Sequence, residues 1–236
     1  MKFRNFAAMQ TCNLLNLGTM DYKQAWDMQL ALFQEKIELK AAGGNPNHDL
    51  IFVEHPHVYT FGKSAERKNL LADSETLTRI GAGVYDIERG GDITYHGPGQ
   101  LVAYPIFDLE QLGIGVKAFV EGIETAIIRT LAEWNIVAET IPGRIGVWID
   151  KDKPNERKIA AIGIKCSRFV SMHGLALNVS TNLEMFGHIV PCGISDKMVC
   201  SMEGELGRQI DMLVVKNTLG KHFASIFGIQ FNNEPQ

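Results

Sequence analysis

The sequence is poor in the features that mark disulfide-stabilised, metal-binding or membrane-spanning chains. Its four cysteines are Cys12, Cys166, Cys192 and Cys200, and none is spaced as a CxxC pair or placed beside paired histidines. This pattern argues against a disulfide framework and a zinc site, and it fits reduced thiols. No apolar run approaches the ~18 residues of a membrane helix, and polar residues at positions 10–13 interrupt the N-terminal apolar stretch. We therefore expect a cytoplasmic protein with no membrane partner.

The chain also lacks an excess of positive charge. Its formal net charge is −4, from 23 Lys and Arg against 27 Asp and Glu, whereas a nucleic-acid-binding surface needs a clear cationic face. We expect no nucleic-acid partner. Hydrophobic residues make up 45% and charged residues 21% of the 236 positions, which is typical of a mid-sized globular protein. We therefore expect residues 1–236 to form a single domain.

Hydrophobic spacing predicts helices that come singly between runs of strands. Helical spacing covers about 21–42, 116–134 and 210–227, with one or two turns over 73–80. In the first helix, the repeating apolar positions are Tyr22, Ala25, Trp26, Leu30, Phe33 and Ile37. Short apolar runs predict strands over 12–17, 50–54, 58–61, 84–88, 93–96, 101–107, 136–141, 145–149, 158–167 and 173–179, and those from 84 to 107 have the spacing of a meander. This order favours an α+β or mixed α/β domain over a doubly wound parallel sheet.

One glycine-rich stretch has the composition of a binding wall. It reads Arg89-Gly90-Gly91-Asp92-Ile93-Thr94-Tyr95-His96-Gly97-Pro98-Gly99-Gln100. Its glycines allow tight turns and a close approach of the backbone to a bound group, while longer side chains fix orientation. A histidine among glycines, here His96 or His173, is more often a hydrogen-bonding scaffold than a catalyst, so both are candidates to line the site rather than to act as the base. A lone arginine such as Arg89 is most often in a surface ion pair.

A second stretch, from Lys158 to Gly193, carries a candidate nucleophile. Cys192 lies between Pro191 and Gly193, where a turn would expose its thiol. A free cysteine is most often a small buried hydrophobe, and a thiol of pKa ~8.5 is only slightly ionised at neutral pH, so a nucleophile needs a base or cation nearby. Lys158 opens an apolar strand, along which its stem can lie. Lys165 is an odd number of residues further, so it would face the other side of the strand.

These residues resemble the octanoyltransferase family of protein lipoylation. The resemblance rests on residues 89–100, on Lys158-Ile159-Ala160-Ala161-Ile162-Gly163, on His173-Gly174-Leu175-Ala176-Leu177-Asn178-Val179 and on Pro191-Cys192-Gly193, and it extends from about Asp49 to Ile194. Asp92 departs from the family pattern, where we expect Gln or Lys, and it changes the local charge of the wall. The resemblance implies the fold shared with biotin and lipoate ligases, a largely antiparallel mixed sheet flanked by helices.

The resemblance also implies an activity. The family moves an octanoyl group from octanoyl-acyl carrier protein to a lysine of a lipoyl domain, as in 2-oxoacid dehydrogenase complexes and the glycine cleavage H protein. Cys192 would carry the acyl group as a thioester and Lys158 would assist, so that no cofactor is required. The acyl slot is expected to contain Arg89, Gly90, Gly91, Asp92, Ile93, Thr94, Tyr95, His96, Ala161, Ile162, Gly163, Gly174, Leu175 and Ala176.

Two alternatives stay open from the residues. An ATP-dependent lipoate- or biotin-protein ligase on the same fold would need a basic phosphate-binding loop and would not need Cys192. A cysteine thioesterase would release free octanoate, and a module that only binds the carrier would form no adduct. Because carrier proteins and lipoyl domains are typically acidic, the transferase hypothesis also predicts a local basic rim, with Arg67, Lys68, Arg144 and Arg157 as candidates.

Overall fold

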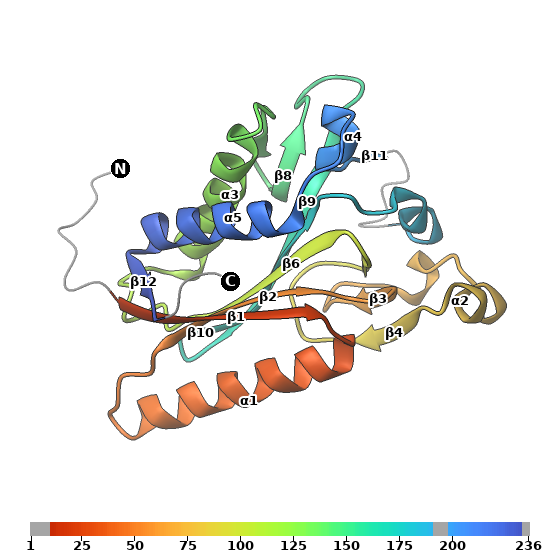
Figure 1. Cartoon of the computed structure of the whole chain (residues 1–236). Helices are drawn as coiled ribbons and strands as arrows, with labels where there is room; N and C mark the ends of the chain where they lie inside the picture. Colours follow the sequence, from red (N-terminus) through yellow and green to blue (C-terminus); the bar gives the residue numbers. More distant parts are fainter. Residues whose placement is uncertain (1–9, 191–197, 233–236) are drawn as a thin grey trace.

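A computed structural model describes residues 10–190 and 198–232, and Figure 1 shows their arrangement in three layers. One large sheet forms the middle layer. Helix α1 (Tyr22–Ala41) covers one face, and helices α3 (Val116–Ala132) and α5 (Met212–Phe227) cover the other. No helix among these residues is both long enough and apolar enough to span a bilayer. The layers agree with the three long helices that the sequence predicts.

The large sheet is mixed but mostly antiparallel. Eight of its nine strands follow the order β12-β1-β2-β6-β10-β9-β8-β7, and β11 pairs beside β9. Strand β1 runs parallel to β2 and β12, and β11 runs parallel to β9, while the other pairs are antiparallel. The strands are β1 (Gln10–Thr19), β2 (His48–Glu54), β6 (Gln100–Ile106), β7 (Glu139–Ile141), β8 (Arg144–Ile149), β9 (Arg157–Ser167), β10 (Val170–Asn178), β11 (Met198–Val199) and β12 (Ile229–Phe231). The predicted α+β fold is confirmed.

A small second sheet corrects the predicted meander. Strand β3 (Val58–Phe61) lies in its centre, parallel to β4 (Gly83–Asp86) and antiparallel to β5 (Thr94–His96). Strands β4 and β5 therefore pair with β3 rather than with each other, and β6 joins the large sheet. The connection between β4 and β5 reaches the large sheet, where Gly90 N–H donates a hydrogen bond to Ile164 O of β9 at 3.0 Å. The glycine-rich stretch thus bridges the two sheets.

Short elements complete the chain. They are the 3₁₀ turns η1 (Arg67–Asn69) and η2 (Leu183–His188) and the helices α2 (Ser74–Ile80) and α4 (Met202–Leu206). Helix α2 was predicted from sequence. Helix α4, strand β11 and strand β12 were not, because they are too short to show a hydrophobic period.

The inner face of α1 differs from the apolar pattern. Tyr22, Ala25, Phe33 and Ile37 are buried as predicted, but Leu30 is 38% exposed. Two polar residues are buried instead: Gln29 Oε1 accepts a hydrogen bond from the His173 N–H, and the Lys36 ammonium pairs with Asp49. Partners on the sheet therefore allow polar groups on this face, which periodicity alone cannot reveal.

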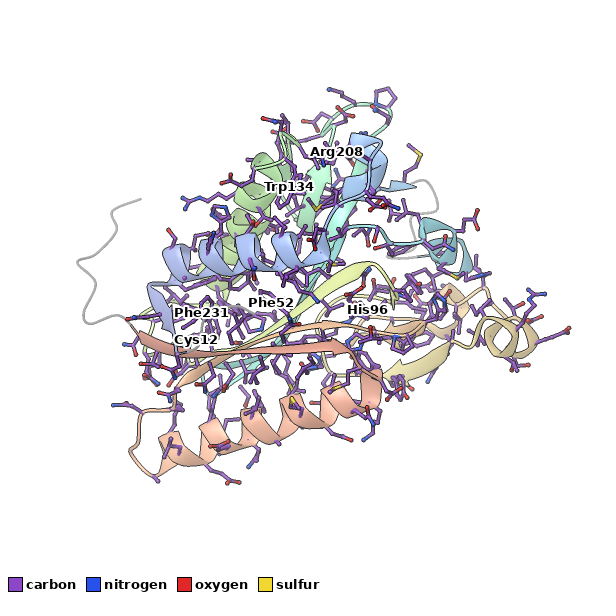
Figure 2. The ribbon with its side chains drawn as sticks, in the orientation of Figure 1. Cys12, Phe52, His96, Trp134, Arg208 and Phe231 are labelled. Atoms are coloured by element: carbon purple, nitrogen blue, oxygen red, sulfur yellow. The ribbon has the colours of Figure 1, made fainter. Side chains whose placement is uncertain are left out.

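The core on the other face is aromatic. Phe107, Phe119, Phe223 and Phe227 contact one another with ring centroids 5.3–6.4 Å apart. Figure 2 shows Phe52 on the same side of the sheet, beneath α5. Each fully buried phenylalanine stabilises the fold by roughly 1.5–3 kcal/mol relative to an exposed one. This cluster fixes α3 and α5 to the sheet.

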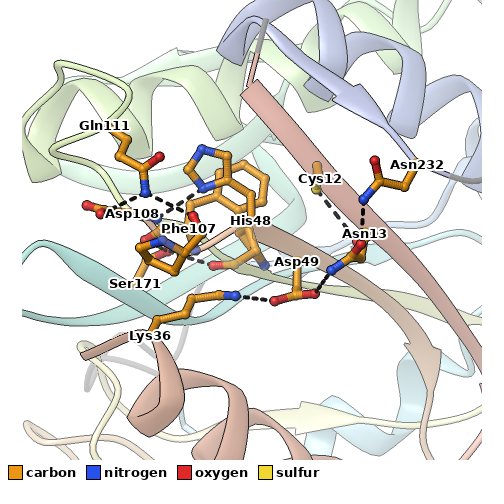
Figure 3. A network of polar contacts seen from close by, with 12 residues as sticks. Cys12, Asn13, Lys36, His48, Asp49, Phe107, Asp108, Gln111, Ser171 and Asn232 are labelled. Carbon is orange, nitrogen blue, oxygen red and sulfur yellow. Dashed lines mark hydrogen bonds and ion pairs between the residues drawn. The ribbon is translucent and has the colours of Figure 1, made fainter. Parts of the chain in front are cut away.

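A buried polar network lies at one end of the large sheet (Figure 3). The ion pair between Lys36 and Asp49 joins α1 to β2, and both side chains are at most 6% exposed. Asn13 Nδ2 donates to Asp49 Oδ1 at 2.8 Å, and Asn232 Nδ2 donates to Asn13 Oδ1 at 2.8 Å. The network therefore ties the first helix, β1, β2 and the segment after β12 together.

Candidate acyl-binding site

Strands β9 and β10 bring two separate sequence motifs into register. Ala161 pairs with Ala176, Ile162 with Leu175, and Gly163 with Gly174. Direct cross-strand partners lie side by side on the same face of a sheet, so the two alanines present only methyl groups there, beside the two glycines. The three predicted residues of each motif thus meet as three consecutive pairs.

Glycine is required at two of these positions by close contacts. A Cβ added to Gly174 would lie 2.1 Å from Ala103 O of β6, and one added to Gly163 would lie 2.8 Å from Gly90 O. Neither distance leaves space for a side chain without a backbone shift. The glycines thus let the neighbouring backbones approach closely.

The glycine-rich stretch forms a wall over this floor. Lys63 N–H donates to Arg89 O at 3.0 Å and Ser64 N–H donates to Gly91 O at 3.2 Å. A Cβ on Gly62 would lie 2.2 Å from Gly91 O, so the wall is pressed against the end of β3. Together with the bond to β9, these contacts fix the wall on two sides.

The Arg89 side chain holds the wall against β3 through hydrogen bonds. Its side chain donates to Thr60 O at 2.8 Å, to Thr60 Oγ1 at 3.1 Å and to Gly90 O at 3.0 Å. Because the residue is only 8% exposed, this guanidinium is not the surface ion pair that a lone arginine usually forms. It holds the loop and also contributes a buried positive charge to the site.

A cavity of about 50 Å³ lies between wall and floor. The predicted residues that line it are Arg89, Thr94, His96, Ala161, Ile162, Gly163, Gly174, Leu175 and Ala176. Sequence reasoning missed Tyr22, Val102 and Tyr104, and considered His173 as a candidate lining residue rather than as the base. The predicted residues Gly90, Gly91, Asp92, Ile93 and Tyr95 belong to the wall or its support and are not part of the lining.

Asp92 faces away from the cavity. Its carboxylate accepts hydrogen bonds from Asn69 Nδ2 at 2.9 and 3.1 Å and from the Ile93 N–H at 2.6 Å. Asn69 O in turn accepts from the Val190 N–H at 2.8 Å. Asp92 therefore connects the wall, through Asn69, to the chain just before residue 191.

Two histidines beside the cavity are neutral at pH 7. Burial lowers the pKa of His96 to about 3, with the nearby His55 as the next cause, and burial lowers the pKa of His55 to about 4. His96 Nδ1 lies 2.8 Å from Gln100 Oε1, so Nδ1 carries the proton. His55 Nε2 lies 2.8 Å from Tyr104 Oη. These contacts fix the orientation of both rings.

His173 differs from these two rings. It is 2% exposed, and neither of its ring nitrogens has a hydrogen-bond partner within the described chain. Its φ of 62° lies in the left-handed region, which costs a non-glycine residue of order 1–3 kcal/mol. Burial, followed by the positive charge of Arg89, lowers its pKa to about 3. A strained backbone that carries a buried ring without hydrogen bonds is more typical of functional sites than of ordinary cores.

Lys158 lies at the start of β9, outside the lining. Its ammonium donates to Ile145 O at 3.2 Å and lies 4.6 Å from the centre of the Trp148 ring. Lys165 lies elsewhere, paired with Glu88 and 5.3 Å from the Phe33 ring on the α1 side. The two lysines thus have separate surroundings. The odd spacing does not decide their faces, because the register of β8 and β9 shifts between the Trp148–Lys158 and Val147–Ala160 pairs and interrupts the alternation.

Cys192 lies outside the described residues, as do Pro191, Gly193 and Ile194. The strand that follows them is described: in β11, Met198 pairs with Arg157 and Val199 pairs with Lys158. The Cys200 N–H also donates to Lys158 O at 3.0 Å. The chain leaving residues 191–197 therefore runs alongside Lys158.

The predicted basic rim is compensated by acidic residues. The ion pairs join Arg67 to Asp86, Lys68 to Glu66, Arg144 to Glu156, and Arg157 to both Asp150 and Glu205. Adjacent opposite charges cancel much of each other's long-range field. These four cations therefore do not form the uncompensated positive patch that steering would need.

Sequence comparison finds a family model and relatives that match most of the chain. The model of the lipoyl protein ligase A/B catalytic domain matches residues 21–224. An octanoyltransferase of Cytophaga hutchinsonii is 51% identical over 227 residues, which cover 92% of this chain and 93% of that one. An octanoyltransferase of Bacteroides fragilis is 50% identical over 200 residues, covering 85% and 90%.

Solved structures show the same fold. The bi-partite lipoate protein ligase of Thermoplasma acidophilum superposes with a TM-score of 0.70 at 17% identity, covering 95% of this chain and 87% of that one. A lipoate-protein ligase A bound with ATP superposes with a TM-score of 0.68 at 15% identity, covering 95% and 88%. At these identities the likeness shows the fold alone.

Proposed function

The chain belongs to the lipoyl protein ligase A/B catalytic domain family, and from this premise we propose that it is a cytoplasmic octanoyltransferase of protein lipoylation. Its donor is octanoyl-acyl carrier protein. Its acceptors are lysines of lipoyl domains in 2-oxoacid dehydrogenase complexes and of the glycine cleavage H protein. The identity of 51% to an octanoyltransferase, over 92% of this chain, supports the octanoyl group as the cargo.

One observation carries the proposal: the register of Ala161–Gly163 with Gly174–Ala176 beneath the glycine wall. Short apolar residues on a rigid sheet suit a flexible alkyl chain, because they leave a narrow space and have few rotamers to reorder. Lys158 precedes Ala161 by three residues on the same strand, roughly 10 Å along it. An acyl chain in this slot has its carbonyl end toward Lys158 and its tail under the wall.

The first half-reaction forms an acyl-enzyme. The Lys158 amine takes the proton of the Cys192 thiol, and the thiolate attacks the carbonyl carbon of the octanoyl thioester. The bond from that carbon to the carrier's sulfur breaks, and the leaving thiolate takes the proton from Lys158. One thioester replaces another, so the step is nearly isoenergetic.

The second half-reaction forms the product amide. The neutral amine of the acceptor lysine attacks the thioester carbonyl, the bond to Cys192 Sγ breaks, and the sulfur leaves with the proton that the amine loses. Amide formation from a thioester is downhill, so this chemistry requires neither ATP nor a cofactor. Lys158 and Cys192 act as one acid–base pair through both halves.

Mass spectrometry of the intact protein tests the proposal. Mixed with octanoyl-acyl carrier protein, the wild type is expected to gain one octanoyl group, on the peptide containing Cys192, and to lose it when a lipoyl domain is added. Cys192→Ser should not form this thioester, and Cys166→Ser, which alters another accessible thiol, should form it as the wild type does.

The alternatives give different products in the same experiment. Release of free octanoate without acceptor would make the protein a thioesterase, and the absence of any adduct would leave only carrier binding. Exchange of pyrophosphate into ATP that depends on lipoate would instead identify an ATP-dependent ligase. Each of these results would overturn the transferase.

A further inference from the structure

His173 separates two cavities of unequal size. The slot of about 50 Å³ lies on one side of it. On the other side lies a space of about 380 Å³ between α1, β4 and the β9–β10 pair, lined by Trp26, Leu30, Asp86, Glu88, Lys165, Met172 and His173. His173 is the residue that the two linings share. His173 therefore borders both spaces.

The slot is small, so a side chain at its end limits how far an acyl chain can extend. Small-molecule sites usually hold about 300–1,000 Å³, and the slot has about 50 Å³. Without the His173 side chain, the slot would join the second cavity, and the joined space reaches the usual range.

His173 is the lining side chain that is least held. Arg89 is bonded to Thr60, His96 to Gln100 and Tyr104 to His55. Neither ring nitrogen of His173 has a hydrogen-bond partner within the described chain, so a change of its rotamer breaks no hydrogen bond. Its backbone is anchored separately, by the N–H bond to Gln29 Oε1 at 3.1 Å.

We propose that the His173 ring is the end wall that sets acyl chain length, and that the second cavity receives the distal carbons of saturated acyl chains longer than octanoyl. This inference rests on the proposed octanoyl transfer. The Trp26, Leu30 and Met172 side chains supply the apolar contacts for these carbons. The Lys165–Glu88 ion pair lies at the solvent side, where the Glu88 side chain is 65% exposed.

Rates of transfer from octanoyl-, decanoyl- and dodecanoyl-acyl carrier protein test the end wall. His173→Gly removes the ring and suits the positive φ, and His173→Asn shortens the side chain with a residue that tolerates the left-handed region. The ratio of kcat/KM for dodecanoyl over octanoyl is expected to rise at least about tenfold in His173→Gly, and less in His173→Asn. Because the ratio is taken within one protein sample, partial unfolding of a variant does not change it.

A second substitution tests the destination of the extra carbons. Leu30→Trp, added to His173→Gly, fills the second cavity and is expected to return the ratio to the wild-type value. Leu39→Trp, at a leucine of the same helix that is 42% exposed and lies outside the lining, is the matched control and should not change the ratio.

The outcomes separate this inference from the proposed function. No octanoyl transfer by the wild type would overturn the proposed function. Normal octanoyl transfer with an unchanged ratio in both His173 variants would overturn the end wall alone. A raised ratio that Leu30→Trp fails to reverse would overturn the second cavity as the receiving space.

Discussion

The two ends of the large sheet bury polar groups in opposite ways. At one end, Lys36 pairs with Asp49 (Figure 3), and Lys40 pairs with Asp108, so buried charges compensate each other. At the other end, beneath the glycine wall, the buried histidines are neutral and face a cavity. Strand β2 connects the two, since Asp49 lies near its start and His55 follows its end.

The ion pairs at the first end stabilise the fold, whereas the neutral histidines at the second end lie at the proposed acyl-binding slot. Charges buried in pairs are costly to break, because the partner left behind is uncompensated. The neutral His173 ring can change its rotamer without breaking a hydrogen bond, because neither of its nitrogens has a partner within the described chain. The charged end is itself not fully satisfied, since His48 Nε2 has no partner within the described chain. The comparison therefore concerns charge compensation and not complete hydrogen bonding.

The largest predicted effect is on the rate at the cavity end. Lys158→Met is expected to slow formation of the Cys192 adduct by ~10²–10⁴-fold, the usual contribution of a general acid–base group. The free energy of unfolding should change by only about 1 kcal/mol, from loss of the contact with the Trp148 ring. Rapid-quench kinetics and urea denaturation measure the two quantities. Lys153→Met, which removes an exposed ion pair with Asp150, should affect neither strongly.

The opposite result is predicted for Lys36 at the charged end. Lys36→Met leaves the buried Asp49 carboxylate uncompensated, so the free energy of unfolding should fall by ~3–5 kcal/mol, while the folded fraction keeps its transfer rate. Lys23→Met breaks an exposed pair with Asp27 and should cost less than about 1 kcal/mol. If Lys36→Met and Lys23→Met were equally stable, the charged end would not support the fold.

A smaller effect is predicted for the floor of the slot. Gly174→Ala places a Cβ 2.1 Å from Ala103 O, so β10 must move, at a cost of ~1–3 kcal/mol. Gly187→Ala is the control, because nothing lies within 4 Å of the Cβ that it adds. Urea denaturation of both variants should show a lower midpoint for Gly174→Ala alone. Equal midpoints would mean that the close packing of β10 on β6 does not constrain the slot.

The smallest predicted effect is a change in pH dependence. The pKa of His48 is lowered to about 4 by burial and then by Lys36, whereas an unfolded histidine has a pKa near ~6.5. The unfolded state therefore binds more protons below pH 6.5, and stability falls with pH down to about 4. His48→Gln should reduce this slope by up to about 1.4 kcal/mol per pH unit between pH 6 and 4.5. Denaturation curves of both proteins at matched pH test this, and equal slopes would contradict a neutral buried His48.

The sequence predicted the elements better than their partners. Periodicity located α1, α3, α5 and most strands to within a few residues, because a buried face repeats along one element. It could not show that β4 and β5 both pair with β3, or that β12 pairs with β1, because such pairings depend on contacts between distant segments. The burial of Gln29 and Lys36 on the inner face of α1 likewise depends on partners in other segments, His173 and Asp49.

The site shows the same division. Motif residues on β9 and β10 were found because they resemble the octanoyltransferase pattern. Tyr22, Val102 and Tyr104 were missed as lining residues, because an apolar side chain facing a cavity has the same sequence pattern as one facing the core. Asp92 was noticed only as a departure from the family pattern, and its bond to Asn69 explains its place.

Filling the slot tests the central claim most directly. Ala161→Leu adds three carbons opposite Ala176, in the first of the three cross-strand pairs that form the floor of the slot. Transfer should be measured with octanoyl- and butanoyl-acyl carrier protein, and with Ser167→Leu at the exposed end of the same strand as control. We predict that Ala161→Leu loses octanoyl transfer by roughly 10–200-fold and keeps most butanoyl transfer. Octanoyl transfer at the wild-type rate would show that the acyl chain does not lie between β9, β10 and the glycine wall.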